Sequence, residues 1–128
     1  DKISEDIKIL KNVFKALKKG GAFVLECISR EIAVKYFTEG EWFERAGMTV
    51  LTEFKVQGAW EGLVSKWILI DKNGKRTEHE FVQRLYSAAE LRDILLKECG
   101  FSSAQVFGGF SGEPYNQNAK TMVIVAKK

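Results

Sequence analysis

Two glycines, Gly20 and Gly21, join an amphipathic helix to a short apolar run, and this junction limits the possible folds more than any other feature. Before the junction, apolar residues recur at helical spacing, namely Ile7, Leu10, Val13, Phe14 and Leu17. After it, the apolar run 22–28 is typical of a strand that is covered on both faces. Helix, turn and buried strand form half of a βαβ unit, and the strand that should precede the helix is absent. The sequence therefore predicts an α/β fold that lacks part of its sheet.

Composition indicates one soluble domain, 1–128, because 45% of the residues are hydrophobic and 29% are charged. The net charge of +3 is small and spread along the chain, so we expect neither a nucleic-acid nor a membrane partner. No apolar run approaches the roughly 20 residues that span a bilayer. Cys27 and Cys99 lack metal-like spacing and are expected to be buried, reduced thiols, which predicts a cytoplasmic protein. A chain that begins at Asp1, without methionine or signal segment, suggests an excised piece.

The middle of the chain, 31–86, is expected to be an antiparallel insert. Its start is read as a short helix at 31–37, followed by a loop that Trp42 and Phe43 anchor. From Thr49 the apolar residues alternate, which is typical of strands with one solvated face. Three strands are predicted, at 49–56, 60–70 and 76–85, with Asp71-Lys72-Asn73-Gly74 as the turn between the last two.

The last third returns to the α/β pattern. Ser87-Ala88-Ala89-Glu90 is a capping box, which predicts the start of a helix that Gly100 ends. An apolar strand at 101–107, a glycine-rich loop at 108–112 and a final strand at 121–126 follow. The segments 1–30 and 87–128 are therefore predicted to form one α/β part around the insert.

This order of elements, from Asp6 to Lys128, resembles the second half of class I methyltransferases that act on small molecules. The segment 17–21, Leu-Lys-Lys-Gly-Gly, is similar to the Leu-Lys-Pro-Gly-Gly turn that precedes the fifth strand of that family, with lysine in place of proline. The segments 84–87 (Arg-Leu-Tyr-Ser) and 99–101 (Cys-Gly-Phe) look like the two ends of its last helix, and 107–128 looks like its final hairpin. The resemblance implies the fifth, sixth and seventh strands of a Rossmann-like sheet, with their helices and a three-stranded antiparallel insert.

The resemblance also implies S-adenosylmethionine as the cofactor of the intact enzyme and a small molecule as its methyl acceptor. That family holds the cofactor with a Gly-x-Gly-x-Gly loop that leads into a helix, and this sequence has none. Gly108, Gly109 and Gly112 lie between two predicted strands. We therefore expect this chain alone to bind no cofactor, and to need either its missing N-terminal half or self-association.

Candidate substrate-binding residues follow the two predicted parallel strands, because ligands of open α/β sheets bind beyond the carboxyl ends of such strands. Glu26, Ser29 and Arg30 end or follow the first strand, and Phe110 and Tyr115 follow the second. For Arg30 the other interpretation is a solvated turn. For the two aromatic residues it is ordinary packing.

Arg84 and Tyr86 are two residues apart, so on a strand they share one face. If that face covers the substrate, Arg84 can bind a carboxylate or phosphate and Tyr86 can orient the methyl acceptor. The alternative is that Arg84 pairs with Glu53, Glu78 or Glu80 in a surface network of small energetic value.

No metal site and no catalytic nucleophile can be argued from this sequence. His79 is the only histidine, and it is flanked by glutamates in a predicted strand. Phe54, Trp60 and Trp67 of the insert can form an aromatic wall for a ligand, or they can be packing residues. Methyl transfer depends mainly on alignment of an already activated methyl group, so the catalytic residues stay unknown.

Two other classes of function stay open. A strand at 22–28 without its neighbour leaves an apolar edge, which predicts a non-catalytic module that oligomerises. An unrelated α+β domain that binds a small ligand is the third possibility. It requires that the strands at 22–28 and 101–107 do not run parallel in one sheet.

Overall fold

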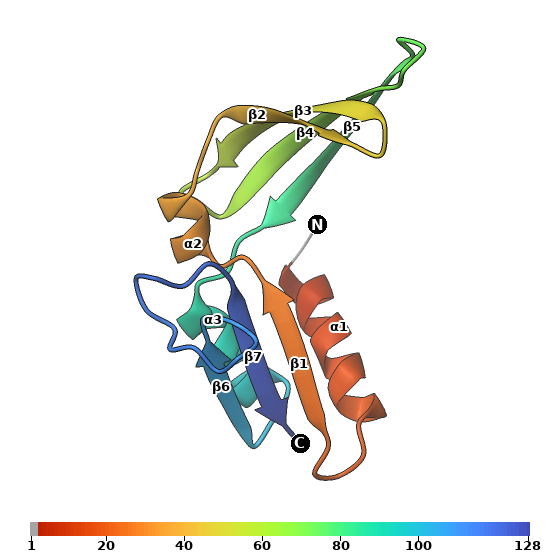
Figure 1. Cartoon of the computed structure of the whole chain (residues 1–128). Helices are drawn as coiled ribbons and strands as arrows, with labels where there is room; N and C mark the ends of the chain where they lie inside the picture. Colours follow the sequence, from red (N-terminus) through yellow and green to blue (C-terminus); the bar gives the residue numbers. More distant parts are fainter. Residues whose placement is uncertain (1–2) are drawn as a thin grey trace. The chain divides into compact units, whose positions relative to one another are not determined.

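A computed structural model describes residues 3–128 of the chain (Figure 1). The residues group into two compact units. The first unit is Asp1–Ile32 with Tyr86–Lys128, and the second is Ala33–Leu85. That the whole chain forms one domain stays a prediction.

The first unit contains a three-stranded sheet with the order β1-β7-β6. Its strands are β1 (Ala22–Cys27), β6 (Ser103–Phe107) and β7 (Met122–Lys127). β7 pairs antiparallel with both neighbours, with Leu25 and Val106 on either side of Ile124. The two strands that flank β7 therefore run in the same direction. This confirms the prediction that the strands at 22–28 and 101–107 are parallel, and the final strand, β7, lies reversed between them.

Two helical segments of the first unit cover one face of this sheet. They are α1 (Ile3–Ala16) and α3 (Ala88–Asp93), and α3 continues into a wider π-helical turn, η1 (Ile94–Glu98). Leu95 and Ile124 are fully buried between helix and sheet, and the rings of Phe14 and Phe101 pack in a T-shaped arrangement with centroids 5.0 Å apart. The predicted capping box is confirmed, because Ser87 Oγ accepts from Glu90 N and the Glu90 carboxylate accepts from Ser87 N.

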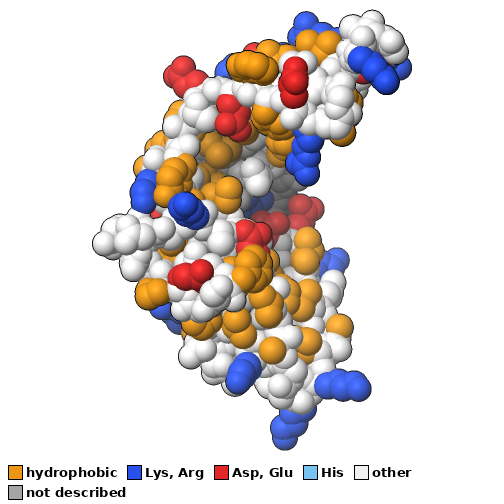
Figure 2. Space-filling view, viewed as in Figure 1, with side chains coloured by type: hydrophobic (Ala, Val, Ile, Leu, Met, Phe, Trp, Pro, Cys, Tyr) orange, Lys and Arg blue, Asp and Glu red, His pale blue; other side chains and the backbone are white. Residues whose placement is uncertain are grey.

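The opposite face of β1 is open, so the prediction of a strand covered on both faces is wrong for this chain. Exposure alternates along β1, and Val24 at its middle is 54% exposed. The cause is that α1, α3 and η1 all pack on the face that carries Phe23 and Leu25. Figure 2 shows hydrophobic side chains gathered over β1 and β7 on this open face.

The second unit is an antiparallel sheet of four strands, not the three that were predicted. The strands, in their spatial order, are β2 (Gly40–Arg45), β3 (Met48–Gln57), β4 (Gly62–Ile70) and β5 (Arg76–Arg84). β2 was missed because its sequence, Gly-Glu-Trp-Phe-Glu-Arg, does not alternate. Its first residue must be small, because a Cβ atom at Gly40 would lie 2.5 Å from the Thr52 carbonyl oxygen.

Local turn chemistry sets the ends of these strands. β4 begins at Gly62 and not at Trp60, because Trp60 adopts a positive φ of 65° in the preceding turn. The predicted turn between β4 and β5 is confirmed. Asp71 Oδ1 accepts from the backbone N–H groups of Asn73 and Lys75, and Gly74 has a φ of 81°.

The remaining helix, α2 (Arg30–Lys35), matches the short helix that was predicted at 31–37. Across residues 3–128, no helix is both long and apolar enough to cross a membrane.

Candidate functional site

A chain of hydrogen bonds joins the segments that follow β1 and β6 in the first unit. Ser29 lies just after β1 and is completely buried, and its Oγ lies 2.5 Å from the Tyr115 hydroxyl oxygen. Tyr115 donates to Glu31 Oε2 at 3.1 Å, and Ser29 Oγ accepts from the Ile32 N–H at 3.2 Å. Because Tyr115 has only one hydroxyl proton, Ser29 must be the donor in the bond between the two hydroxyls. In this cluster Ser29 therefore donates to Tyr115, and Tyr115 donates to the Glu31 carboxylate.

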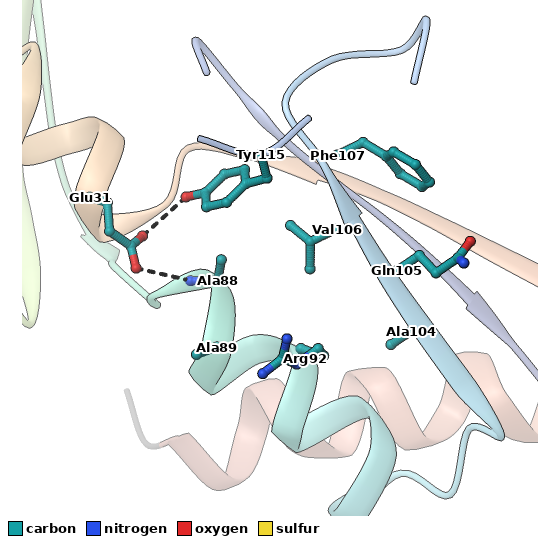
Figure 3. A pocket seen from close by; sticks show the side chains of 9 residues that line it. All are labelled: Glu31, Ala88, Ala89, Arg92, Ala104, Gln105, Val106, Phe107 and Tyr115. Carbon is teal, nitrogen blue, oxygen red and sulfur yellow. Dashed lines mark hydrogen bonds between the residues drawn. The ribbon is translucent and has the colours of Figure 1, made fainter. Parts of the chain in front are cut away.

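The environment keeps the Tyr115 phenol protonated. Burial raises its pKa above the ordinary value, and the nearby Glu31 carboxylate adds to the rise, while the hydrogen bond from Ser29 opposes it. At neutral pH the phenol is therefore a stable hydrogen-bond donor. The second oxygen of Glu31, Oε1, accepts from the Ala88 N–H at 3.3 Å, so the same carboxylate joins the cluster to the start of α3 (Figure 3).

Arg30 and Tyr86 lie beside each other in the same unit. The Arg30 N–H donates to the Tyr86 carbonyl oxygen at 2.8 Å, and the guanidinium of Arg30 lies 3.0 Å from the Glu90 carboxylate. The Tyr86 hydroxyl donates to Asp6 Oδ2 at 2.6 Å. The pKa of Glu90 is lowered, first by the hydrogen bond from the Ser87 backbone and then by Arg30. Arg30 is thus an ordered ion-pair partner and not a freely solvated side chain.

A pocket of about 630 Å³ lies between α3 and β6 in the first unit. Its charged and polar lining side chains are Glu31, Arg92, Gln105 and Tyr115, and its apolar lining residues are Ala88, Ala89, Ala104, Val106 and Phe107 (Figure 3). This volume lies within the range of about 300–1,000 Å³ that is usual for small-molecule sites. The pocket is open on one side, and its lining includes one positively charged side chain, Arg92, and one negatively charged side chain, Glu31.

The structure thus brings four of the predicted site residues into one neighbourhood of the first unit, namely Ser29, Arg30, Tyr86 and Tyr115. Glu26 is one strand position before the end of β1, and its carboxylate accepts from the Thr121 hydroxyl. Phe110 is 74% exposed in the loop between β6 and β7 and does not line the pocket.

Arg84 and Tyr86 do not share one strand face, so this prediction is wrong. β5 ends at Arg84, and Tyr86 belongs to the first unit, where its hydroxyl is bonded to Asp6. His79 is exposed in β5 of the second unit, where it pairs across the sheet with Trp67. The aromatic residues of that unit contact one another, since Trp67 lies 6.2 Å from Phe43 and 6.4 Å from Phe81 between ring centroids.

The glycine-rich loop encloses a carboxylate of its own. Ser111 N donates to Glu113 Oε2 at 2.9 Å, and a Cβ atom at Gly109 would lie 2.6 Å from that same oxygen. The Gly108 N–H donates to the Glu113 carbonyl oxygen at 2.7 Å. A dinucleotide or S-adenosylmethionine is held by free backbone amides at the start of a helix, and this loop does not offer them. The glycines of this segment therefore do not fit S-adenosylmethionine.

Sequence reasoning missed the residues that complete this neighbourhood. Glu31 binds both Tyr115 and the start of α3, Asp6 binds Tyr86, and Arg92 lines the pocket. Glu31 directly follows a predicted site residue, so its position next to Arg30 was the available signal. Nothing in the local sequence distinguishes Asp6 or Arg92 from the other charged residues of their helices.

Comparison with proteins of known structure identifies the fold. The chain superposes on the CcbJ methyltransferase from Streptomyces caelestis with a TM-score of 0.77 and 17% identity, covering 96% of this chain and 52% of that one. An S-adenosylmethionine-dependent methyltransferase from Clostridium acetobutylicum gives 0.76 and 17%, covering 97% and 51%. CalS10, an amino pentose methyltransferase from Micromonospora echinaspora, gives 0.60 and 17%, covering 99% and 52%.

The fold is that of these methyltransferases. The predicted α/β class with an antiparallel insert is thereby confirmed, apart from the number of insert strands. The chain spans about half the length of the solved structures that it matches. No protein-family description and no curated protein matches the sequence.

Proposed function

We propose that this chain is the C-terminal part of an S-adenosylmethionine-dependent methyltransferase that acts on a small molecule. The observation that carries the proposal is the order β1-β7-β6 with β7 reversed, in a chain that superposes on half of several such enzymes. CalS10 is an amino pentose methyltransferase, so a sugar is one acceptor class to test first. The parallel direction of β1 and β6 in one sheet also favours this proposal over an unrelated α+β domain.

In this proposal the substrate lies beyond the carboxyl ends of β1 and β6. Ser29, Tyr115 and Glu31 are the ordered polar groups there, and Glu31 ends the hydrogen-bond chain with a carboxylate that can accept a proton. Arg84, Tyr86, Glu26, Arg30 and Phe110 stay proposed substrate contacts. A cytoplasmic location is part of the same proposal.

The cofactor would be held mainly by residues outside this sequence. The only loop here with several closely spaced glycines, 108–112, lies between two strands and is closed on Glu113. Isothermal titration of the chain with S-adenosylmethionine is therefore expected to give no binding tighter than about millimolar. A dissociation constant of about 10 μM or below for this chain alone would contradict the proposed division of the site.

The positive half of the test uses the coding sequence upstream of Asp1. If it encodes a glycine-rich loop between a strand and a helix, the joined protein is expected to bind S-adenosylmethionine and to transfer its methyl group to an amino sugar. A joined protein that folds but binds no S-adenosylmethionine would refute the proposed function.

A second candidate is an association module without catalysis. The observation that favours it is the open edge and open face of β1, where Val24 is 54% exposed and, among residues 3–128, β7 is the only strand paired with β1. Light scattering separates the candidates. A stable oligomer of the 128-residue chain that persists when it is joined to its upstream half would favour the module.

A further inference from the structure

The pocket between α3 and β6 is closed at one end by the segment that follows the glycine-rich loop. Phe107 forms an antiparallel bridge with Pro114, and the Gly108 N–H donates to the Glu113 carbonyl oxygen at 2.7 Å. These contacts bring the next residue, Tyr115, to the carboxyl end of β6, where its side chain lines the pocket. The pocket is therefore a bounded hollow and not a free strand edge.

Short apolar side chains form the walls of this hollow. Ala88 and Ala89 line it from α3, and Ala104 and Val106 line it from β6 (Figure 3). These side chains end in methyl groups and offer no hydrogen-bonding partner to a ligand. The walls therefore suit the apolar part of a small molecule.

Glu31 supplies the negative end of the pocket. Its Oε2 accepts from the Tyr115 hydroxyl at 3.1 Å and its Oε1 accepts from the Ala88 N–H at 3.3 Å, so both oxygens are held in place. Each carboxylate oxygen has two lone pairs, and one on each oxygen stays available. Because Glu31 is exposed, this fixed carboxylate can accept hydrogen bonds from an ammonium group of a ligand.

Arg92 supplies the positive end. Among residues 3–128 its only ion pair joins Nε to Asp93 Oδ1 at 4.0 Å, and Asp93 is bonded more closely to Lys97, at 2.6 Å. The guanidinium is thus available for a two-fold contact with a carboxylate. Arg92 follows Ala88 by one helical turn, or about 6 Å along the axis. Side chains on a helix lean toward its start, so the two charged ends suit a compact molecule.

We propose that this pocket binds a free amino acid with an apolar side chain. Its ammonium group donates to Glu31, its carboxylate accepts from Arg92, and its side chain packs against the alanine and valine walls. Binding requires neither a cofactor nor methyl transfer, so this proposal can fail while the proposed function holds.

The charges argue against other small ligands. Inorganic phosphate can pair with Arg92, but it has no apolar part for the walls and is repelled by the Glu31 carboxylate. A simple alkylamine can pair with Glu31, but it leaves Arg92 without a partner. A zwitterion with an apolar side chain satisfies both ends and the walls.

The test is a titration of the isotope-labelled 128-residue chain with L-leucine at constant pH, followed by amide NMR. We expect the largest shifts at 88–92 and 104–107, with a dissociation constant of about 1 mM, because exposed charge pairs contribute little. Three analogues each lack one feature: N-acetyl-L-leucine lacks the ammonium, L-leucinamide lacks the carboxylate, and glycine lacks the apolar side chain. Each is expected to bind about tenfold more weakly.

Two variants locate the ligand. Arg92→Gln should weaken leucine binding by about tenfold. The matched Arg45→Gln, at an exposed position in β2 of the second unit, should leave it unchanged. Ala89→Leu fills the pocket from an exposed helix position, where leucine is a good helix former, and should abolish the shifts at 104–107.

Three results would overturn the proposal. The first is the absence of shifts at 88–92 and 104–107 at about 10 mM leucine, tenfold above the expected dissociation constant. The second is equal binding of leucine and any of the three analogues, which would show that the missing feature is not recognised. The third is unchanged leucine binding in folded Arg92→Gln, which would place the ligand elsewhere.

Discussion

The hydrogen bond between Ser29 and Tyr115 offers the clearest quantitative test of the candidate site. Tyr115→Phe removes the hydroxyl that accepts the Ser29 proton 2.5 Å away, and Ser29 is completely buried, so water cannot replace it. A buried donor without a partner costs about 1–3 kcal/mol. Ser29→Ala removes the same bond and also the acceptor of the Ile32 N–H, so a similar loss is expected.

The double variant should lose less than the sum of the two single losses. Once Ser29 is alanine, the Tyr115 hydroxyl has only Glu31 as a partner, so its removal costs less than in the native chain. We expect a coupling energy of about 1 kcal/mol from a cycle of urea unfolding curves. In thermal unfolding each single variant should lower Tm by about 4 °C per kcal/mol.

Tyr36→Phe is the matched control, because Tyr36 is half exposed and its ring contact with the Lys35 ammonium does not need the hydroxyl. Its stability should change by less than about 0.5 kcal/mol. If the Ser29 and Tyr115 losses add within about 0.3 kcal/mol, the two hydroxyls are independent and the ordered hydrogen-bond chain is refuted.

Three further predictions concern the first unit, and the last of them uses Leu51 of the second unit as its comparison. Because the pKa of Tyr115 is raised, the folded chain keeps a proton which the unfolded chain releases above pH 10. The free energy of unfolding should therefore fall above that pH. Urea unfolding should show a less steep fall in Tyr115→Phe. Ser87→Ala removes the capping box with Glu90 and should cost about 1 kcal/mol in the same assay, or less than 0.3 if the cap is unimportant. Leu95→Ala, at a fully buried site, should cost about 2–5 kcal/mol, whereas Leu51→Ala at a partly exposed site should cost under 1; equal losses would contradict the assigned core.

The parts of the fold that could be predicted are those with a local cause. The glycine pair at 20–21, the capping box at Ser87 and the turn at 71–74 each follow from the chemistry of a few neighbouring residues, and all three lie where predicted. The position of β7 between β1 and β6 could be predicted only from the resemblance to class I methyltransferases, because hydropathy gives no information on strand order. β2 was missed since its glutamates and aromatic residues do not alternate.

Residues of the candidate site could be predicted only where they follow the end of a predicted strand. Ser29 and Tyr115 were found because both follow strands that end at the same edge, and the structure joins them directly. Glu31 and Asp6 were missed because their partners are far away in sequence, and Arg92 was missed because the pocket that it lines is completed by residues of β6. Glu31 meets Ala88 and Tyr115, which are 57 and 84 residues later in the chain. Such pairings depend on how the chain folds back on itself, and no local pattern encodes them.

The open face of β1 is apolar, although it is exposed to solvent. Val24 is apolar and lies at the middle of a strand, yet it is 54% exposed, while Leu25 beside it packs into the core. An alternating strand of a solvated sheet would place a polar residue at such a position, because an exposed valine gains nothing from folding. The sequence of β1 is therefore suited to a sheet with cover on both faces, and this chain supplies cover on one. A chain joined to its upstream half should protect Val24 from solvent, and hydrogen exchange of β1 that is equally fast with and without that half would contradict this argument.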